Sequence, residues 1–194
     1  MKLYFAPGAC SLADHIALHE AGVQFEHEKV DLKAKKTASG VDFGTISAKG
    51  YVPVLILDSG ETLTENVAML DWIAQQAPAL APPDAMGRTR LLEMLAYIST
   101  EIHKSFAPFF QGGSEEQKRQ ASDKLAERFS WIAGQIHGDF LFGDAVSVAD
   151  CYLFVMLLWA EKNQLAVEPK LADLCERMKQ RPAVKLALTH EGLA

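Results

Sequence analysis

The stretch VPVLIL, residues 52–57, decides the fold of this chain. A run of β-branched and aliphatic residues is typical of a buried strand, yet proline has no amide hydrogen to donate to a neighbouring strand. A cis bond between Val52 and Pro53, as occurs where proline stands in a tight bend, leaves the amide and carbonyl of Val52 facing outward. We therefore expect these two backbone groups to pair with a peptide-like molecule.

Two polar residues, Glu65 and Asn66, follow the hairpin signal Asp58-Ser59-Gly60 and open a segment with helical periodicity, residues 67–76. Amides at the beginning of a helix and short polar side chains bind charged groups. The pattern predicts that this corner holds both ends of a zwitterion.

The first 77 residues read as β-α-β-α-β-β-α. Ser11 and Asp14 have the spacing of a capping box, which predicts that Ser11 caps the first helix. The elements are expected at residues 2–5, 11–22, 23–32, 42–46 (one helical turn), 52–57, 61–63 and 67–76.

A proline-rich stretch, residues 78–84, is the one segment with the composition of a linker. Beyond it every long segment has helical periodicity, at about residues 88–111, 115–137, 147–162, 169–180 and 183–190. Ser147 and Asp150 form a second capping-box pattern, and the segment they open is apolar on all sides. We expect this segment to be the buried central helix of the second domain.

Composition excludes several classes of partner. The net charge is −6, and the basic residues are scattered rather than gathered into a stripe, so we expect no nucleic acid and no membrane surface as a partner. Three widely spaced cysteines indicate neither a disulfide framework nor a zinc knuckle. The N-terminus is broken by Pro7-Gly8 before a signal sequence could form, so we expect a cytoplasmic protein.

The segments Pro7-Gly8-Ala9-Cys10-Ser11-Leu12, Val52-Pro53, Leu63-Thr64-Glu65, Glu101-Ile102-His103-Lys104 and Ser147-Val148-Ala149-Asp150 carry a further signal. Together they resemble the cytosolic glutathione transferases, and within them the bacterial beta class. The other matching segments are Leu3-Tyr4, Lys49-Gly50 and Glu191-Gly192-Leu193.

The resemblance implies a thioredoxin-like α/β domain at residues 1–77, with a mixed four-stranded sheet and three helices, that binds glutathione. It further implies a linker at residues 78–87 and an all-helical domain at residues 88–194. That second domain would form the site for an apolar electrophile and part of the interface of a homodimer. Glutathione would be the co-substrate, and the chemistry needs no metal.

Three residues are candidates for activating the glutathione thiol. Cys10 lies at the mouth of the first helix, where the helix dipole and free amides favour a thiolate, although a lone cysteine is also a common apolar filler. Ser11 is a second donor whose hydroxyl is equally suited to capping the helix. His103 matches the beta-class histidine and could donate to the sulfur, although lone histidines on helices usually face solvent.

For binding glutathione, the resemblance assigns six residues: Cys10, Lys35, Val52, Pro53, Glu65 and Asn66. Val52, beside Pro53, pairs with the cysteinyl part, and Glu65 binds the γ-glutamyl ammonium. Asn66 or its amide binds the adjacent carboxylate. Lys35 reaches the glycyl carboxylate, although it also reads as part of a solvated basic pair.

The aromatic residues Phe106, Phe109 and Phe110 follow His103 around Pro108, which we expect to kink the helix and turn the rings toward the cleft. They are candidates for the wall of the electrophile pocket, although an aromatic stripe more often belongs to a core.

Three functions remain open at this stage. The first is conjugation of glutathione thiolate to apolar electrophiles. The second is a thiol transferase or peroxidase-like activity in which Cys10 forms a mixed disulfide with glutathione. The third is a non-catalytic transferase-like binding module, which is suggested by departures from the family pattern such as Tyr51 beside Val52.

Overall fold

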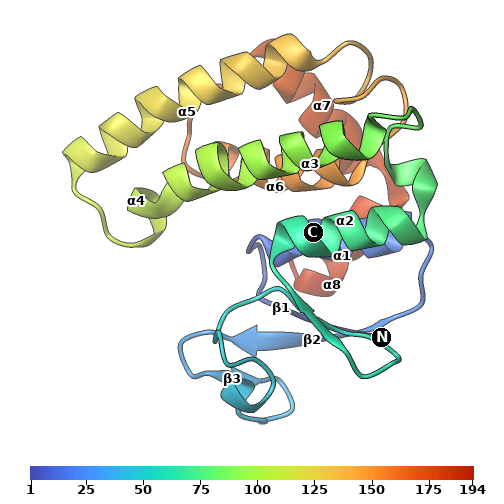
Figure 1. Cartoon of the computed structure of the whole chain (residues 1–194). Helices are drawn as coiled ribbons and strands as arrows, with labels where there is room; N and C mark the ends of the chain where they lie inside the picture. Colours follow the sequence, from blue (N-terminus) through green and yellow to red (C-terminus); the bar gives the residue numbers. More distant parts are fainter.

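The computed structural model describes the whole chain, residues 1–194, and its first part is a mixed sheet of five strands (Figure 1). Their order is β3-β2-β1-β4-β5. β1 and β2 are parallel, and the other neighbouring pairs are antiparallel. The strands are β1 (Lys2–Phe5), β2 (Glu26–Asp31), β3 (Lys36–Thr37), β4 (Val54–Ile56) and β5 (Thr62–Thr64).

The predicted fold class is confirmed, with one more strand than the four expected. The additional strand, β3, is two residues long and lies between the strand predicted at residues 23–32 and the helical turn predicted at residues 42–46. Two residues cannot show an alternating pattern, because alternation becomes detectable only over about four residues or more.

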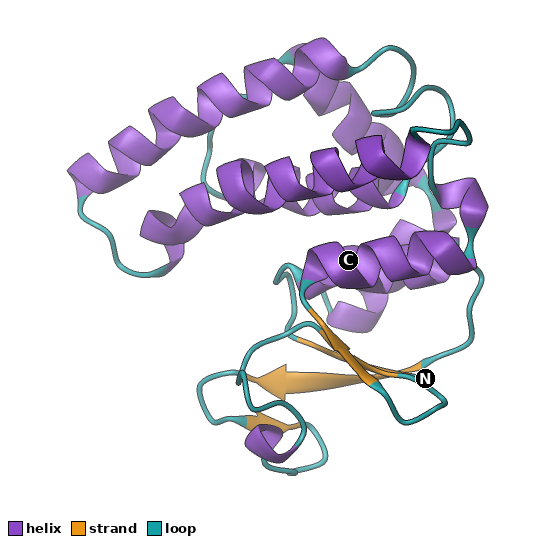
Figure 2. Ribbon diagram, in the orientation of Figure 1, coloured by secondary structure: helices purple, strands orange, loops and turns teal.

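Helices lie mainly on one side of the sheet and form most of the C-terminal part of the chain, with loops between them (Figure 2). They are α1 (Ser11–Glu20), η1 (Phe43–Thr45), α2 (Asn66–Gln76), η2 (Pro78–Leu80), α3 (Gly87–Tyr97), η3 (Ile98–Ile102), η4 (His103–Phe106), α4 (Ala107–Phe110), α5 (Glu115–Gln135), α6 (Val148–Lys162), α7 (Pro169–Gln180) and α8 (Pro182–Glu191). The segment η3 is a turn of π-helix, and η1, η2 and η4 are 3₁₀-helices. No helix is both long and apolar enough to cross a membrane.

Side chains alternate between the two faces of the sheet. Leu3 on β1 is paired with Leu55 on β4, and both belong to the main core together with α1 and α2. The neighbouring pair, Tyr4 and Val54, belongs to a smaller cluster that includes Phe43 of η1. This is the two-residue period of a strand that is buried on both faces.

The main core continues from the sheet into the C-terminal helices. Helix α6 is buried along nearly its whole length, as its all-apolar sequence predicts. Helix α8, from the end of the chain, packs back against α1 (Figure 1). The first and last helices of the chain are therefore neighbours in space.

One predicted capping box is confirmed and the other is wrong. At α6, the Ser147 hydroxyl accepts from the amide of Asp150, and the Asp150 carboxylate accepts from the amide of Ser147 at 2.8 Å. At α1, the N-cap position is Cys10, and the Ser11 hydroxyl instead contacts the amide and carbonyl of Ala6, at 3.2 and 3.4 Å. The Ser11 side chain therefore holds the loop that precedes the helix.

Candidate active site

The backbone before Pro53 has part of the arrangement predicted from the sequence: the amide of Val52 is free, but its carbonyl is engaged by Cys10. The Val52–Pro53 bond is cis, and β4 begins only at Val54. The amide of Val52 has no hydrogen-bond partner within the protein. Its carbonyl oxygen lies 3.7 Å from the Sγ atom of Cys10, which donates to it. A backbone donor and a thiol thus stand side by side.

The ionisation expected for Cys10 is wrong. Burial raises the pKa of the Cys10 thiol to about 12, and the negative charge of Asp14 adds to the effect. The amides of Cys10 and Ser11 act in the opposite direction, but they are outweighed. Cys10 is therefore a neutral S–H donor at neutral pH rather than a thiolate.

Two cavities meet at Cys10. The larger, of about 810 Å³, is lined mainly by apolar side chains, among them Trp159 and Phe110. The smaller, of about 330 Å³, has a more polar lining that includes Glu65 and Asn66. Cys10, Tyr51, Val52 and His103 line both cavities. A polar ligand in one cavity and an apolar one in the other would therefore meet at the Cys10 sulfur.

Glu65 enters the smaller cavity from a strained backbone position. Its φ angle is 72°, a conformation that non-glycine residues rarely adopt and that persists where the surrounding structure holds it. The Oε1 atom accepts from Lys49 Nζ at 2.5 Å and from Tyr51 Oη at 2.7 Å. These two donors, Lys49 first, lower the pKa of Glu65, and Oε2 has no protein partner. One carboxylate oxygen therefore remains for a ligand cation.

The side chains of Asn66 and Lys35 are already engaged. Asn66 Nδ2 donates to the Cys10 carbonyl at 2.8 Å and to Asp14 Oδ2 at 3.1 Å. The side chain of Asn66 thus connects α2 to the Cys10 loop. Only the backbone amide of Asn66 remains to bind a ligand. Lys35 Nζ donates to the carbonyl of Gly50 at 2.7 Å and lines neither cavity.

His103 lies beside the cavities because the helix changes its winding there. The amide of His103 donates to the carbonyl of Ile98, five residues back, which is the π-helical pattern. Its Nδ1 is 2.6 Å from the hydroxyl of Tyr152 on α6. Burial lowers the pKa of His103 to about 4, and the Lys104 charge contributes, so the ring is neutral.

Of the three phenylalanines predicted for the electrophile wall, only Phe110 lines the larger cavity. Phe106 is fully buried in the core, and Phe109 lines neither cavity at Cys10. The prediction failed because the continuous helix we expected is broken from Ile98 onward, ten residues before Pro108, and this shifts which side chains face the cleft.

Sequence reasoning missed Tyr152, Trp159, Lys49 and the contact that Tyr51 makes with Glu65. Trp159 Nε1 donates to the carbonyl of Gly8 at 2.8 Å, which joins α6 to the Cys10 loop. The sequence carried a signal for Tyr152 and Trp159. A Tyr and a Trp in an otherwise apolar, buried helix each need a hydrogen-bond partner for the O–H or N–H group. Lys49 was marked only by the family match of Lys49-Gly50, which assigned it no role.

Comparison with known proteins identifies the family. The model for the C-terminal domain of glutathione S-transferases matches residues 93–182, and that for their N-terminal domain matches residues 9–76. Together the two matches cover most of the chain, with the site divided between them. The chain belongs to the glutathione S-transferase family.

Within the family it belongs to the bacterial beta class. Glutathione S-transferase GstA of Escherichia coli O157:H7 is 39% identical over 100% of both chains. The solved structure of a beta-class glutathione S-transferase from Sphingomonas chungbukensis is 45% identical, with a TM-score of 0.90 over 100% of both chains. A sphingomonad glutathione S-transferase complexed with glutathione is 46% identical, with a TM-score of 0.90 and the same coverage.

Proposed function

We propose that this protein is a glutathione transferase that presents the glutathione thiol as a thiolate to apolar electrophiles. The observation that carries the proposal is the meeting of two cavities at Cys10 and Val52, one with a polar lining and one largely apolar. In this proposal, residues 1–77 form the domain that binds glutathione and residues 88–194 form the domain that completes the electrophile site. Residues 78–87 link the two domains.

The smaller cavity supplies the contacts that a γ-glutamyl tripeptide needs. The unpartnered amide of Val52 pairs with the cysteinyl carbonyl of the ligand. The free Oε2 of Glu65 receives the γ-glutamyl ammonium, and the amide of Asn66, at the beginning of α2, receives the adjacent carboxylate. Lys35 reaches the glycyl carboxylate only after leaving Gly50.

Activation of the ligand thiol means lowering its pKa from about 8.5, and each unit corresponds to about 1.4 kcal/mol of preferential thiolate stabilisation. Cys10 contributes as a neutral donor once its S–H turns from the carbonyl of Val52 to the ligand sulfur, because its raised pKa keeps the proton on its own sulfur. His103 contributes through Nε2, since we assign the Tyr152 hydroxyl as donor to Nδ1 and the ring proton to Nε2. Ser11 does not activate the thiol in this proposal, because its hydroxyl accepts a hydrogen bond from the amide of Ala6 and so holds the loop before α1.

The larger cavity selects apolar electrophiles. Phe110, Leu158, Trp159 and Leu193 line it, and His103 lies at the border with the glutathione side. Bringing an electrophile to a bound thiolate there uses proximity together with exclusion of water as the main catalytic effects.

A second candidate, thiol transfer through a Cys10 mixed disulfide, is supported by one observation. Cys10 is a free cysteine whose side chain lines both cavities. Its raised pKa opposes a nucleophilic role, because the thiolate is the attacking form. Conjugation is therefore the function that the geometry supports better.

The same proposal includes a homodimer in the cytoplasm. Trp131 on α5 is 45% exposed and lies against Tyr97 of α3, with 4.4 Å between ring centroids. An exposed tryptophan that packs on a half-buried tyrosine suits a subunit interface. Light scattering at several protein concentrations measures the assembly.

Calorimetry with glutathione tests the binding site. We expect saturable binding to the wild-type protein and loss of measurable binding in Glu65→Ala, together with loss of conjugation to a chlorinated nitroaromatic compound. Glu61→Ala is the matched control, since it removes an exposed carboxylate from the same hairpin, whose partner is Ser59. Equal affinity in Glu65→Ala and wild type would remove the assignment.

A further inference from the structure

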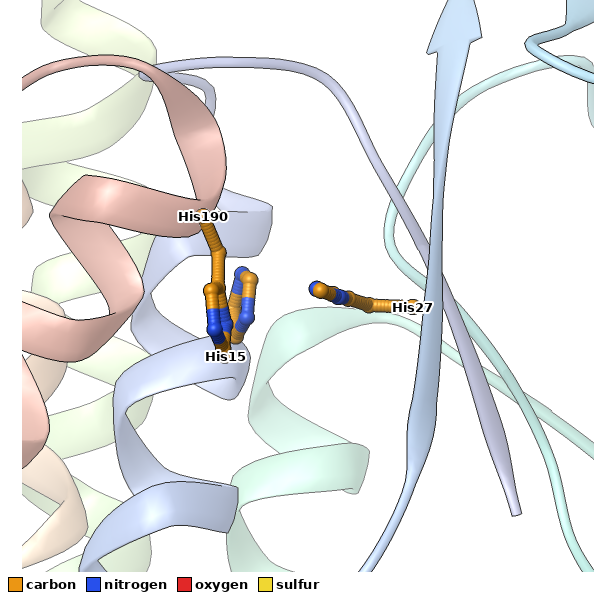
Figure 3. A group of neighbouring side chains, drawn as sticks. All are labelled: His15, His27 and His190. Atoms are coloured by element: carbon orange, nitrogen blue, oxygen red, sulfur yellow. The ribbon is translucent and has the colours of Figure 1, made fainter.

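Three histidines from distant parts of the chain converge at a place where none of them lines either of the two cavities. His15 on α1, His27 on β2 and His190 on α8 each offer one ring nitrogen, and these nitrogens all lie within 4.8 Å of one another. Figure 3 shows the rings of His15 and His190 side by side, with His27 pointing toward them from its strand. The centroids of His27 and His190 are 4.3 Å apart.

Two of these histidines have nitrogens without a partner. The Nε2 atoms of His15 and of His27 are both buried, and neither makes a hydrogen bond. Leaving a buried polar atom unpaired costs free energy, so such atoms in a native structure call for an explanation. A bound metal ion would explain both atoms at once, because it would be a partner for both nitrogens.

The other nitrogen of His15 is held as in known metal sites. His15 Nδ1 lies 3.0 Å from Glu191 Oε1, and Glu191 Oε2 accepts from the amide of Gly8 at 2.9 Å. A ligating histidine usually contacts a carboxylate through its second nitrogen, which fixes the ring and directs the free nitrogen at the metal. Glu191 is placed to act in this way.

Aromatic packing accounts for part of the cluster but not for all of it. Phe5 and Phe25 flank the rings, with centroids 5.3 and 5.6 Å from that of His15. Stacking of this kind stabilises the ring planes. It provides no partner for the two buried Nε2 atoms, and it would be served as well by phenylalanine as by histidine.

We propose that His15, His27 and His190 bind one borderline transition-metal ion such as Zn²⁺, which joins α8 to α1 and β2. Imidazole ligands suit Zn²⁺, Ni²⁺ and Cu²⁺. Zinc binds histidine nitrogen at about 2.0–2.1 Å, so the nitrogens must approach one another slightly on binding. His190 is exposed, and its Nδ1 lies 3.4 Å from Nε2 of His19, a long contact that this adjustment can break. The fourth coordination position stays open.

The test uses full-length protein without a histidine tag, stripped of metal with a chelator and titrated with Zn²⁺ in a calorimeter. We expect one ion per chain. At a Zn²⁺ concentration of 100 times Kd, the melting temperature should rise by about 5–10 °C, and the chelator should reverse the rise. His27→Ala and His190→Ala should each weaken binding at least about tenfold.

His137→Ala is the matched control, because it removes an exposed histidine outside the cluster and should leave binding unchanged. Circular dichroism of the metal-free variants verifies their folding, and His190→Ala, at an exposed position, serves if His27→Ala is unstable. X-ray absorption at the zinc edge should show nitrogen or oxygen ligands at about 2.0 Å. No binding, unchanged affinity in both cluster variants, or a sulfur ligand at about 2.3 Å, as expected from binding at Cys10, would overturn the proposal.

Discussion

The hydroxyl of Tyr51 donates a hydrogen bond to Oε1 of Glu65 over 2.7 Å. Lys49 donates to the same oxygen at 2.5 Å, so both donors hold one side of the carboxylate and leave Oε2 free. The residue proposed to bind the ligand ammonium is therefore oriented by two neighbours before any ligand arrives. Preorganisation of this kind reduces the entropy lost on binding.

Tyr51→Phe should weaken glutathione binding about 3- to 5-fold, because it removes one of the two orienting hydrogen bonds in a solvent-exposed setting. The maximal rate should change little, since Tyr51 does not touch the thiol in this account. Steady-state kinetics with varied glutathione separate the two effects. Tyr97→Phe, which alters a phenol on α3, is the control, and a fall in kcat without a rise in KM would contradict the prediction.

Cys10 should react slowly with alkylating reagents. Since burial raises its pKa to about 12, the thiolate fraction is small at neutral pH. The alkylation rate by iodoacetamide should climb about tenfold per pH unit from roughly pH 7 to 10. Peptide mass spectrometry follows the site. A rate that levels off near neutral pH would show that Cys10 is a thiolate.

Cys10→Ala should retain conjugation and lose any thiol-transfer activity. Removing the S–H donor destabilises the thiolate of bound glutathione, so the pKa of that thiol should rise by up to about one unit. The ultraviolet absorbance of the thiolate, recorded against pH, measures the shift. Loss of nearly all conjugating activity in this variant would contradict the prediction that Cys10 acts only as a donor.

Tyr152→Phe should lower the conjugation rate about 3- to 10-fold, because it frees the ring of His103 that the phenol now orients.

The pKa of His103 is lowered to about 4, so this histidine stays neutral as pH rises through 5 to 8. The rate profile of the wild-type protein should therefore show no histidine ionisation in that window. An inflection near pH 6.5 that disappears in His103→Gln would contradict this prediction.

Ser147→Ala should destabilise the fold by about 1–2 kcal/mol and lower the melting temperature by about 2–8 °C. Ser147 is buried, and its hydroxyl completes the cap of the central helix α6. The activity of the folded protein should be unchanged. Ser114→Ala removes the matching cap of α5 at an exposed position and should cost less, as differential scanning calorimetry will show. Equal losses would mean that burial of the cap is unimportant.

Features that depend on short stretches of sequence were predictable. The cap at Ser147 and the buried helix after it depend on a few adjacent residues, and the backbone left free at Val52 depends on a single proline that cannot donate. The Val52–Pro53 bond is cis, as the interpretation of the sequence required.

Features that depend on burial or on distant partners were not predictable. The pKa of Cys10 depends on desolvation, which only the folded chain determines. The partner of His103, Tyr152, is 49 positions away. The positions of Phe106 and Phe110 depend on a π-helical turn at Ile98, which the sequence does not mark. Hydrophobic periodicity assumes a regular helix and fails where the winding changes.

The most direct test of the central claim follows the amide of Val52 during a titration with glutathione. In the ligand-free protein this amide has no partner, and in the proposed complex it donates to the tripeptide. Two-dimensional ¹H–¹⁵N NMR should show a saturable downfield shift of the Val52 amide proton, with the same midpoint as calorimetry. Saturation of binding with the Val52 resonance unmoved would contradict the account.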